Sequence, residues 1–160
     1  MVAIDVRRQW QYNQLQNNIR SIQSIIDMNN PDALTTYRDT GTGWTVLEVI
    51  CHLRDYETLF TERVQAMIKE DNPNLVNPNP DELAIENEYM AQNVQDVMDT
   101  WHDSRLALID LFMSLDDEQW QRTGVHPRRG EYTSSDQLAL TTLHDTVHIE
   151  QITRILNEKR

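Results

Sequence analysis

Two histidines four residues apart, His144 and His148, stand in the segment LHDTVHIEQI. Apolar residues recur around them at helical spacing, which predicts a helix from about residue 133 to 157. At about 100° per residue, His144, His148 and Gln151 fall within about 60° of one another, inside the apolar arc of this helix. Two histidines at this spacing have Cβ atoms about 5–6 Å apart and can share one metal ion. The alternative is a pair of core histidines held by ordinary hydrogen bonds.

A third histidine would strengthen the metal interpretation, and the chain has three more. His52 lies on the shoulder of the apolar arc of a second predicted helix, on the same side as Glu48 and Tyr56, and can face a neighbouring helix from there. His102 has a similar shoulder position on another predicted helix. His126 precedes a proline in a predicted loop, where we expect it to be exposed to solvent.

Two familiar metal templates do not fit. A carboxylate-bridged di-iron bundle uses Glu-x-x-His pairs, and no histidine of this chain has a glutamate three residues before it. The run HDTVH resembles the HExxH motif of zinc proteases, with Asp145 in the place of the glutamate. Aspartate is one methylene shorter, and few residues follow that could supply a third ligand, so a protease is not expected.

The elements that would position these residues are helical. The chain has 4 glycines and little of the alternation that predicts strands. Periodic apolar residues predict a first helix from about residue 4 to 28, a second from about 45 to 70 and a third from about 94 to 115. Thr45 and Glu48 have the spacing of a capping box at the start of the second helix.

The connections are predicted to be irregular. NNP at 29–31 stops the first helix, TYRDTGTG reads as a long loop, and DNPNLVNPNP is too rich in proline to be helical. Residues 116–132 are predicted to form one helical turn followed by a loop or small hairpin. The prediction is an all-α, single-domain four-helix bundle over residues 1–160, in which simple up-down-up-down order is not assured.

Composition limits the functions that this bundle can have. The chain has 160 residues, 39% apolar residues and a net charge of −12. We expect no membrane partner, because no run approaches the ~18–20 apolar residues of a membrane span. We expect no nucleic-acid partner, because no basic stripe is present. No signal peptide is visible and Cys51 is the only cysteine, so we expect a cytoplasmic protein.

The motifs together resemble those of the DinB-like superfamily of four-helix-bundle metalloproteins. The resemblance rests on GWTVLEVICHLRDYE and on YTSSDQLALTTLHDTVHIEQI, in this order. It implies that His52, His144 and His148 bind a divalent metal, zinc or nickel, and that the protein forms homodimers. Members with known activities are thiol-dependent S-transferases or isomerases that use bacillithiol, mycothiol or glutathione.

The resemblance therefore implies a metal-dependent thiol S-transferase acting on a small electrophile. Three histidines would leave an open coordination position, as in catalytic zinc sites. Two alternatives remain: a bundle that binds metal and ligand without catalysis, and a hydrolase that uses metal-bound water. The sequence does not identify catalytic residues, the thiol or the substrate.

Other residues near the histidines have two interpretations each. Glu48, Tyr56 and Gln151 can line the site or support a ligand, or they can cap a helix, pack in the core or bond within the helix. Cys51 reads as a small buried hydrophobe rather than a nucleophile. Arg128 and Arg129 can hold the carboxylates of an anionic thiol or belong to a solvated loop, and the solvated loop is the preferred interpretation.

Overall fold

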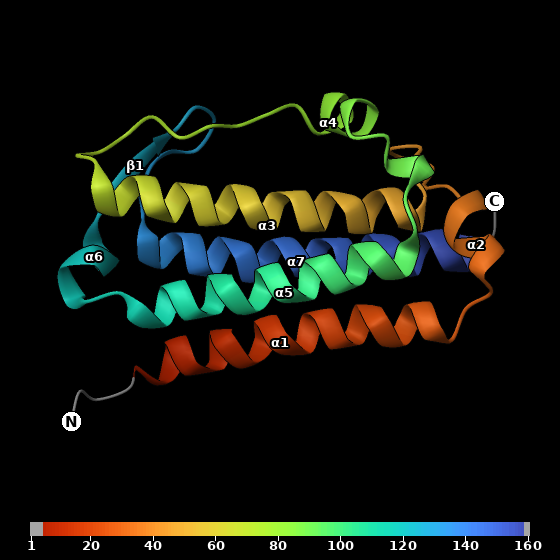
Figure 1. The fold of residues 1–160 in the computed structure, drawn as a ribbon, viewed down its shortest axis with the longest axis horizontal. Coiled ribbons are helices and arrows are strands. Elements are labelled where there is room, and N and C mark those ends of the chain that lie inside the picture. The colour runs from red at the N-terminus through yellow and green to blue at the C-terminus, as the bar shows by residue number, and fades with distance from the viewer. Residues whose placement is uncertain (1–4, 159–160) are drawn as a thin grey trace.

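The computed structural model describes residues 5–158 and consists of four long helices joined by shorter elements (Figure 1). The long helices are α1 (Val6–Asp27), α3 (Val46–Lys69), α5 (Val94–Ser114) and α7 (Ser134–Glu158). The predicted all-α four-helix bundle is confirmed. The predicted start of the first helix, residue 4, lies outside the described residues.

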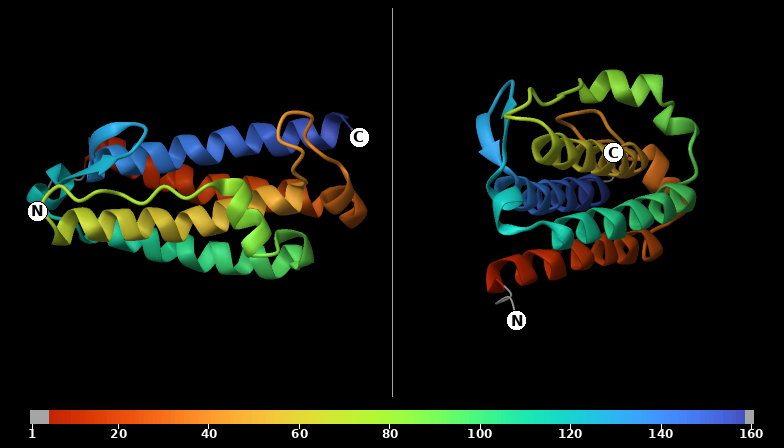
Figure 2. Two further views of the ribbon diagram at one scale, coloured as in Figure 1. Left: turned by 90° about the horizontal axis from the view of Figure 1, so that it is seen from above. Right: turned by 60° about the vertical axis from the view of Figure 1, so that its left-hand side comes forward.

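The helices do not alternate in direction along the chain. In Figures 1 and 2, α1 and α7 run one way, while α3 and α5 both run the opposite way. This arrangement is possible because residues 70–93 return along the length of the bundle before α5 begins. The order is therefore up-down-down-up, and α3 packs against both α5 and α7.

Two short helices that were not predicted from the sequence lie in the connections, α2 (Pro31–Thr36) and α4 (Pro80–Glu86). Each begins with an Asn-Pro pair. The side chains of Asn30 and Asn79 accept the backbone N–H two residues ahead, at 2.9 Å in both cases. Proline at the first helical position loses no hydrogen bond, because that N–H has no partner in a helix. The segments predicted to be irregular, 36–43 and 71–80, overlap these helices by one residue each. A single 3-10 turn, η1 (Tyr89–Ala91), follows α4.

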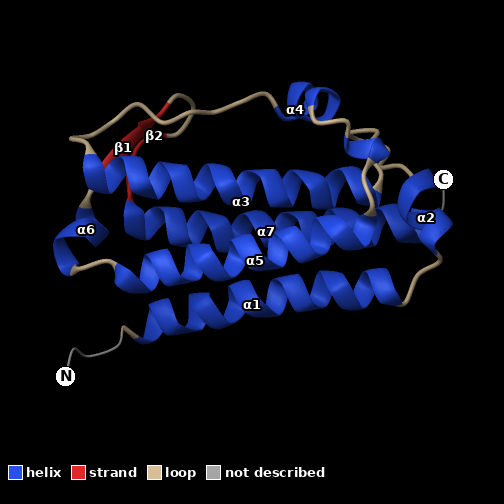
Figure 3. Ribbon diagram, viewed as in Figure 1, coloured by secondary structure: helices blue, strands red, loops and turns tan. Residues whose placement is uncertain are grey.

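A helical turn and a small hairpin precede α7, as predicted: α6 (Asp117–Gln121), β1 (Thr123–His126) and β2 (Gly130–Thr133) (Figure 3). The hairpin is fastened to the return segment. The N–H of Val125 donates to the carbonyl of Pro73 at 2.8 Å, and the N–H of Leu75 donates to the carbonyl of Val125 at 2.9 Å. A Cβ atom on Gly124 would lie 2.8 Å from Leu75 Cδ2, so only glycine permits this close approach.

The start of α3 sets the orientation of His52. The N–H of Thr45 donates to Glu48 Oε2 at 2.8 Å, and the N–H of Glu48 donates to Thr45 Oγ1 at 3.2 Å. This is the predicted capping box, and the helix begins at the next residue, Val46. Seven residues after Thr45, or about two turns, His52 points to the same side of α3 as the box.

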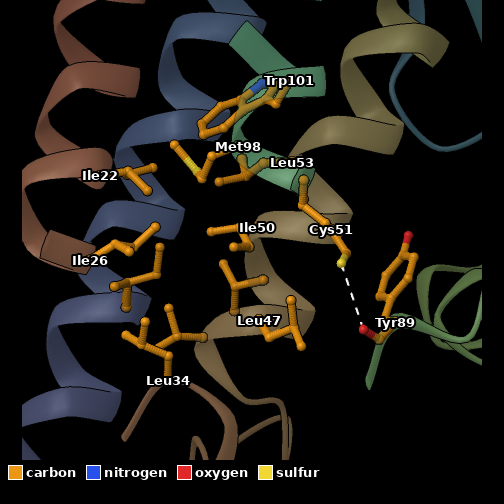
Figure 4. Close-up of a cluster of buried hydrophobic side chains, with 14 of the residues drawn as sticks. Ile22, Ile26, Leu34, Leu47, Ile50, Cys51, Leu53, Tyr89, Met98 and Trp101 are labelled. Atoms are coloured by element: carbon orange, nitrogen blue, oxygen red, sulfur yellow. Dashed lines mark hydrogen bonds between the residues drawn. The ribbon is translucent and has the colours of Figure 1, made fainter. Parts of the chain in front are cut away.

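The core consists of two apolar clusters along the bundle axis. Figure 4 shows the first, where Ile22 of α1, Ile50 of α3 and Met98 of α5 pack together and Cys51 Sγ faces the carbonyl of Tyr89 at 3.9 Å. The second gathers around Leu108 and Phe112 of α5. Across residues 5–158, no helix is both long enough and apolar enough to cross a membrane.

Candidate metal centre

Three imidazoles from two helices converge on one point. The Nε2 atom of His144 lies 3.1 Å from Nε2 of His52 and 3.2 Å from Nε2 of His148. One nitrogen of each ring lies within 4.8 Å of the others. Three nitrogens that bind one zinc ion tetrahedrally at about 2.0–2.1 Å stand about 3.3 Å apart. The separations therefore fit a shared metal ion.

The tautomer of His148 can be derived from its hydrogen bonds. The carboxylate of Asp39 only accepts, so the amide nitrogen of Gln151, 3.1 Å away, must face it. The amide oxygen of Gln151 then faces Nδ1 of His148 at 2.8 Å, and this Nδ1 must carry the proton. The Nε2 atom of His148 is left with a lone pair directed at the other two histidines, as metal binding requires.

Asp39 is itself held firmly in the loop before α3. Its carboxylate also accepts from Thr42 Oγ1 at 2.9 Å and from Arg154 Nε at 3.0 Å. Burial alone would raise the pKa of Asp39, but the hydrogen bonds from Arg154, Thr42 and Gln151 outweigh it and hold this pKa well below its usual range. Asp39 therefore stays ionised and keeps the amide of Gln151 oriented.

All three histidines are neutral at pH 7. Burial, and after it the neighbouring His148, lowers the pKa of His52 to about 3. Burial also lowers the pKa of His144 and that of His148, and in His148 it outweighs the opposite effect of the bond to Gln151. Neutral imidazole is the form that binds a metal. The buried Nδ1 of His52 has no hydrogen-bond partner among the described residues.

Aromatic rings surround the cluster. The ring of Tyr56 lies 4.0 Å from that of His52, and it stacks on His144 at 5.3 Å with an angle of 15° between the planes. Phe60 meets His144 edge-on at 5.2 Å, and Trp44 lies 5.2 Å from His52. These contacts restrict the rotation of the imidazoles of His52 and His144.

The histidines lie in the walls of three cavities. The largest, about 610 Å³, has His52, His144 and Tyr56 on one side and residues 77–81 on another. A cavity of about 260 Å³ adjoins His144, and one of about 410 Å³ adjoins His148 and Gln151. A small molecule in the largest cavity can therefore reach the cluster directly.

The remaining candidates have different positions. Glu48 forms the capping box and accepts from Arg38 Nη1 at 3.3 Å; no hydrogen bond joins it to His52 among residues 5–158. His102 is exposed on α5. Burial raises the pKa of the Cys51 thiol to about 12, so this cysteine is not a thiolate at neutral pH.

Asp145, the neighbour of His144, belongs to a buried ion pair. The guanidinium of Arg105 contacts Asp145 at 2.7 Å and Glu57 at 2.5 Å, and all three side chains are 1% exposed. Asn18 donates to Asp145 at 3.2 Å, and the carbonyl of Leu15 accepts from Arg105 at 2.8 Å. This network joins α1, α3, α5 and α7 beside the cluster, so Asp145 holds α7 in place and does not face the cavities.

The prediction for His126 was wrong. Its side chain is buried, with 1% exposure, and it lines the cavity of about 610 Å³ together with His52 and His144. The hairpin carries it there, since β1 pairs with the return segment, residues 70–93. No local pattern in the sequence indicates this pairing, and the prediction failed for that reason. Asp39 was missed for a similar reason: its partners Gln151 and Arg154 are more than a hundred residues away.

Sequence comparison identifies a matching protein family and a related protein of known sequence. The sequence profile described as the DinB superfamily matches residues 11–152. A protein of Oceanobacillus iheyensis, named as a candidate metal-dependent hydrolase, is 27% identical over 138 residues, which cover 85% of this chain and 77% of the relative.

Solved structures share the fold. YfiT from Bacillus subtilis, described as "a probable metal-dependent hydrolase with an unusual four-helix bundle topology", superposes with a TM-score of 0.86 at 20% identity, over 99% of this chain and 91% of YfiT. A mycothiol-dependent maleylpyruvate isomerase superposes with a TM-score of 0.75 at 10% identity, over 92% of this chain and 61% of the isomerase. At these identities the likeness is one of fold.

Proposed function

The chain belongs to the DinB superfamily, as its motifs predicted, and we propose that it binds one divalent metal ion through Nε2 of His52, His144 and His148. The observation that carries this proposal is the convergence of three neutral imidazoles in the wall of a cavity large enough for a small molecule. Zinc and nickel both suit such a set of nitrogen ligands.

We further propose that the protein is a metal-dependent enzyme that transfers a small thiol to an electrophile. When bound, the ion supplies Lewis acidity that lowers the pKa of a thiol or a water molecule beside it. Among the described residues, Asp81 is the only carboxylate that lines the three cavities, and it accepts from Trp44 Nε1 at 3.1 Å. A thiol ionises more easily than water, so a site with few candidate bases is better suited to thiol chemistry.

The chain's own residues have defined parts in this proposal. Gln151 and Asp39 keep His148 in the tautomer that leaves Nε2 free. Tyr56 and Phe60 pack against the ring of His144 and hold its orientation. The phenol of Tyr56 faces the carbonyl of Pro78 at 3.4 Å and can also reach a ligand in the same cavity.

Hydrolysis is the second candidate, because the Oceanobacillus iheyensis protein and YfiT are both described as metal-dependent hydrolases. A third is a bundle that binds metal and ligand without catalysis. A chlorinated arene with added thiol separates them: S-transfer consumes the arene only when thiol and metal are both present, hydrolysis consumes ester or amide substrates without thiol, and a binding protein does neither.

The first test is the metal content of protein purified without a polyhistidine tag or added metal. We expect about one zinc or nickel ion per chain by mass spectrometry and loss of this metal in His52→Ala. His102→Ala is the matched control, because it removes an exposed histidine from another helix and should keep the metal. No metal in the wild-type protein, even after dialysis against zinc, would overturn the proposal.

A further inference from the structure

A group of cations lies beside the histidines in a protein whose net charge is −12. Arg128 and Arg129, in the turn between β1 and β2, line the cavity of about 610 Å³, and Arg129 also lines the adjoining cavity of about 260 Å³. Arg63 of α3 also lines that smaller cavity, and no acidic residue is among the described residues that line this cavity. The positive charge is therefore concentrated where a ligand would enter.

Arg63 is a buried cation that lacks a neutralising partner. It is 4% exposed, and its Nε and Nη2 atoms donate to the carbonyl of Val76 at 3.0 and 2.6 Å. No carboxylate lies within ion-pair distance of it among residues 5–158. Arg105, equally buried, is matched by two carboxylates. A buried charge without a counter-ion is unfavourable, so an anion near Arg63 would be stabilised.

His126 adds a donor to this group. Its Nδ1 atom lies 3.1 Å from the N–H of Arg128 and 3.3 Å from the N–H of Arg129, and backbone N–H groups can only donate. The Nδ1 atom must therefore accept, and the proton of the neutral ring lies on Nε2. Burial, and then the charges of Arg63, Arg129 and Arg128, lowers the pKa of His126, which keeps the ring neutral at pH 7.

Two donors consequently face each other. Nη1 of Arg129 lies 3.3 Å from Nε2 of His126, and both atoms carry hydrogen, so neither satisfies the other. A carboxylate oxygen beside the pair, about 2.8 Å from each nitrogen, would accept from both. Hydrogen bonds from a guanidinium to a carboxylate are short and strong because both partners are charged.

We propose that Nε2 of His126 and the guanidinium of Arg129, supported by the charge of Arg63, form a subsite for the carboxylate of a small-molecule ligand. The ligand lies in the cavity shared with His52 and His144, so the subsite directs its remaining atoms toward the three histidines. This inference depends on the proposed function only for the reaction that follows binding. The carboxylate can belong to the thiol or to the electrophile.

The subsite can be tested without metal. Propionate is titrated into chelator-treated protein, and the ring resonances of His126 are followed by NMR. We expect saturable shifts in the wild-type protein and about tenfold weaker binding in Arg129→Gln, the scale of losing one charged hydrogen bond. Arg20→Gln, an exposed position on α1, is the matched control because it changes the net charge equally, and it should bind like the wild type.

A second measurement identifies which reactant carries the carboxylate. Calorimetry on zinc-loaded protein compares 3-mercaptopropionate with the uncharged 3-mercaptopropanol. Tighter binding of the carboxylate in the wild type, lost in Arg129→Gln, supports the subsite and assigns it to the thiol. Equal binding of the two thiols, with propionate still bound in the first test, supports it and assigns it to the electrophile. Failure of propionate to bind overturns the subsite, whereas failure of zinc alone would overturn only the proposed function.

Discussion

The hydrogen bond between His148 and Gln151 determines which nitrogen of this histidine is free to bind. Gln151 can impose this only because its amide is fixed from the other side by Asp39. The ring of His148, a proposed metal ligand, is thus oriented by the hydrogen-bonded side chains of Gln151 and Asp39 and not by the helix alone. Such outer contacts fix the ring and raise the basicity of the ligand nitrogen.

Replacing Gln151 by alanine should therefore weaken metal binding without removing a ligand. We expect an affinity about 10–100-fold lower, the range found for lost outer contacts of metal sites. Competition with a chromophoric chelator measures this directly. Thr153→Ala, on the exposed face of the same helix, is the control. Equal affinities in Gln151→Ala and the wild type would show that the bond does not orient His148.

At the level of residues, the sequence predicted the helical face shared by His144, His148 and Gln151, because positions on one helix follow from spacing. It placed His52 only on a shoulder, and the structure brings that ring within hydrogen-bond distance of His144. It could not place His126 or Asp39. Both depend on contacts with segments far away in the chain, which no local pattern records.

At the level of elements, the four long helices are tied together by one buried guanidinium. Arg105 of α5 contacts Glu57 of α3, Asp145 of α7 and the backbone of Leu15 in α1. Asp145 lines none of the three cavities, but it is the next residue after His144 in α7. The network therefore fixes the rotation of α7 from a side that faces away from the cavities. The geometry of the proposed metal centre thus depends on helix packing.

Removing this cation should destabilise the bundle strongly. Arg105→Met leaves two buried carboxylates without a partner, and we expect a loss of about 3–5 kcal/mol in the free energy of unfolding. Urea denaturation followed by circular dichroism measures it. Glu150→Ala, which breaks an exposed pair with Arg154, should change the midpoint little. A similar, small effect of both variants would contradict the structural role assigned to Arg105.

The long helices were predictable because each has a continuous apolar face, and the capping box located the start of α3. The short helices α2 and α4 were not, because helices of six and seven residues are too short to show a periodic apolar face and proline was taken only as a helix breaker. Their Asn-Pro starts were the signal that could have revealed them. The parallel pairing of α3 and α5 also had no signature, since direction depends on the path of residues 70–93.

At the level of the whole molecule, the three clustered histidines, of which His52 is buried and the other two are half-buried, couple stability to pH. The pKa values of His52, His144 and His148 lie below the value of about 6.5 that histidine has in an unfolded chain. Between these values the unfolded chain binds more protons than the folded one. Stability is therefore fully present above about pH 6.5 and is lost as the pH falls toward the folded pKa values.

Metal-free protein should consequently unfold at lower urea concentration at pH 5 than at pH 7.5. His144→Gln removes one of the groups responsible, so its midpoint should fall less over the same interval. Urea titrations at the two pH values, after treatment with chelator, measure both effects. Equal falls in the variant and the wild type would mean that His144 does not contribute to the pH dependence.

Dimerisation and the absence of a nucleic-acid partner remain predictions from the sequence, and sedimentation velocity would test the first.

The excess of negative charge over the rest of the molecule contrasts with the arginines that line the cavities near the histidines. A carboxylate ligand would be repelled by most of the surface and attracted at one cavity. Salt screens both the repulsion by the surface and the attraction at the cavity, so the association rate of a carboxylate ligand should depend on ionic strength.

The wide separation of the histidines along the chain has a consequence for folding kinetics. His52 and His144 are 92 residues apart, and they meet only after α7 docks against α3. Contacts between distant segments form slowly, because a long loop must close first. A chain in which only α1, α3 and α5 have assembled holds one of the three imidazoles. Capture of a metal would then report the completion of folding, and in refolding experiments it should lag behind the recovery of helicity.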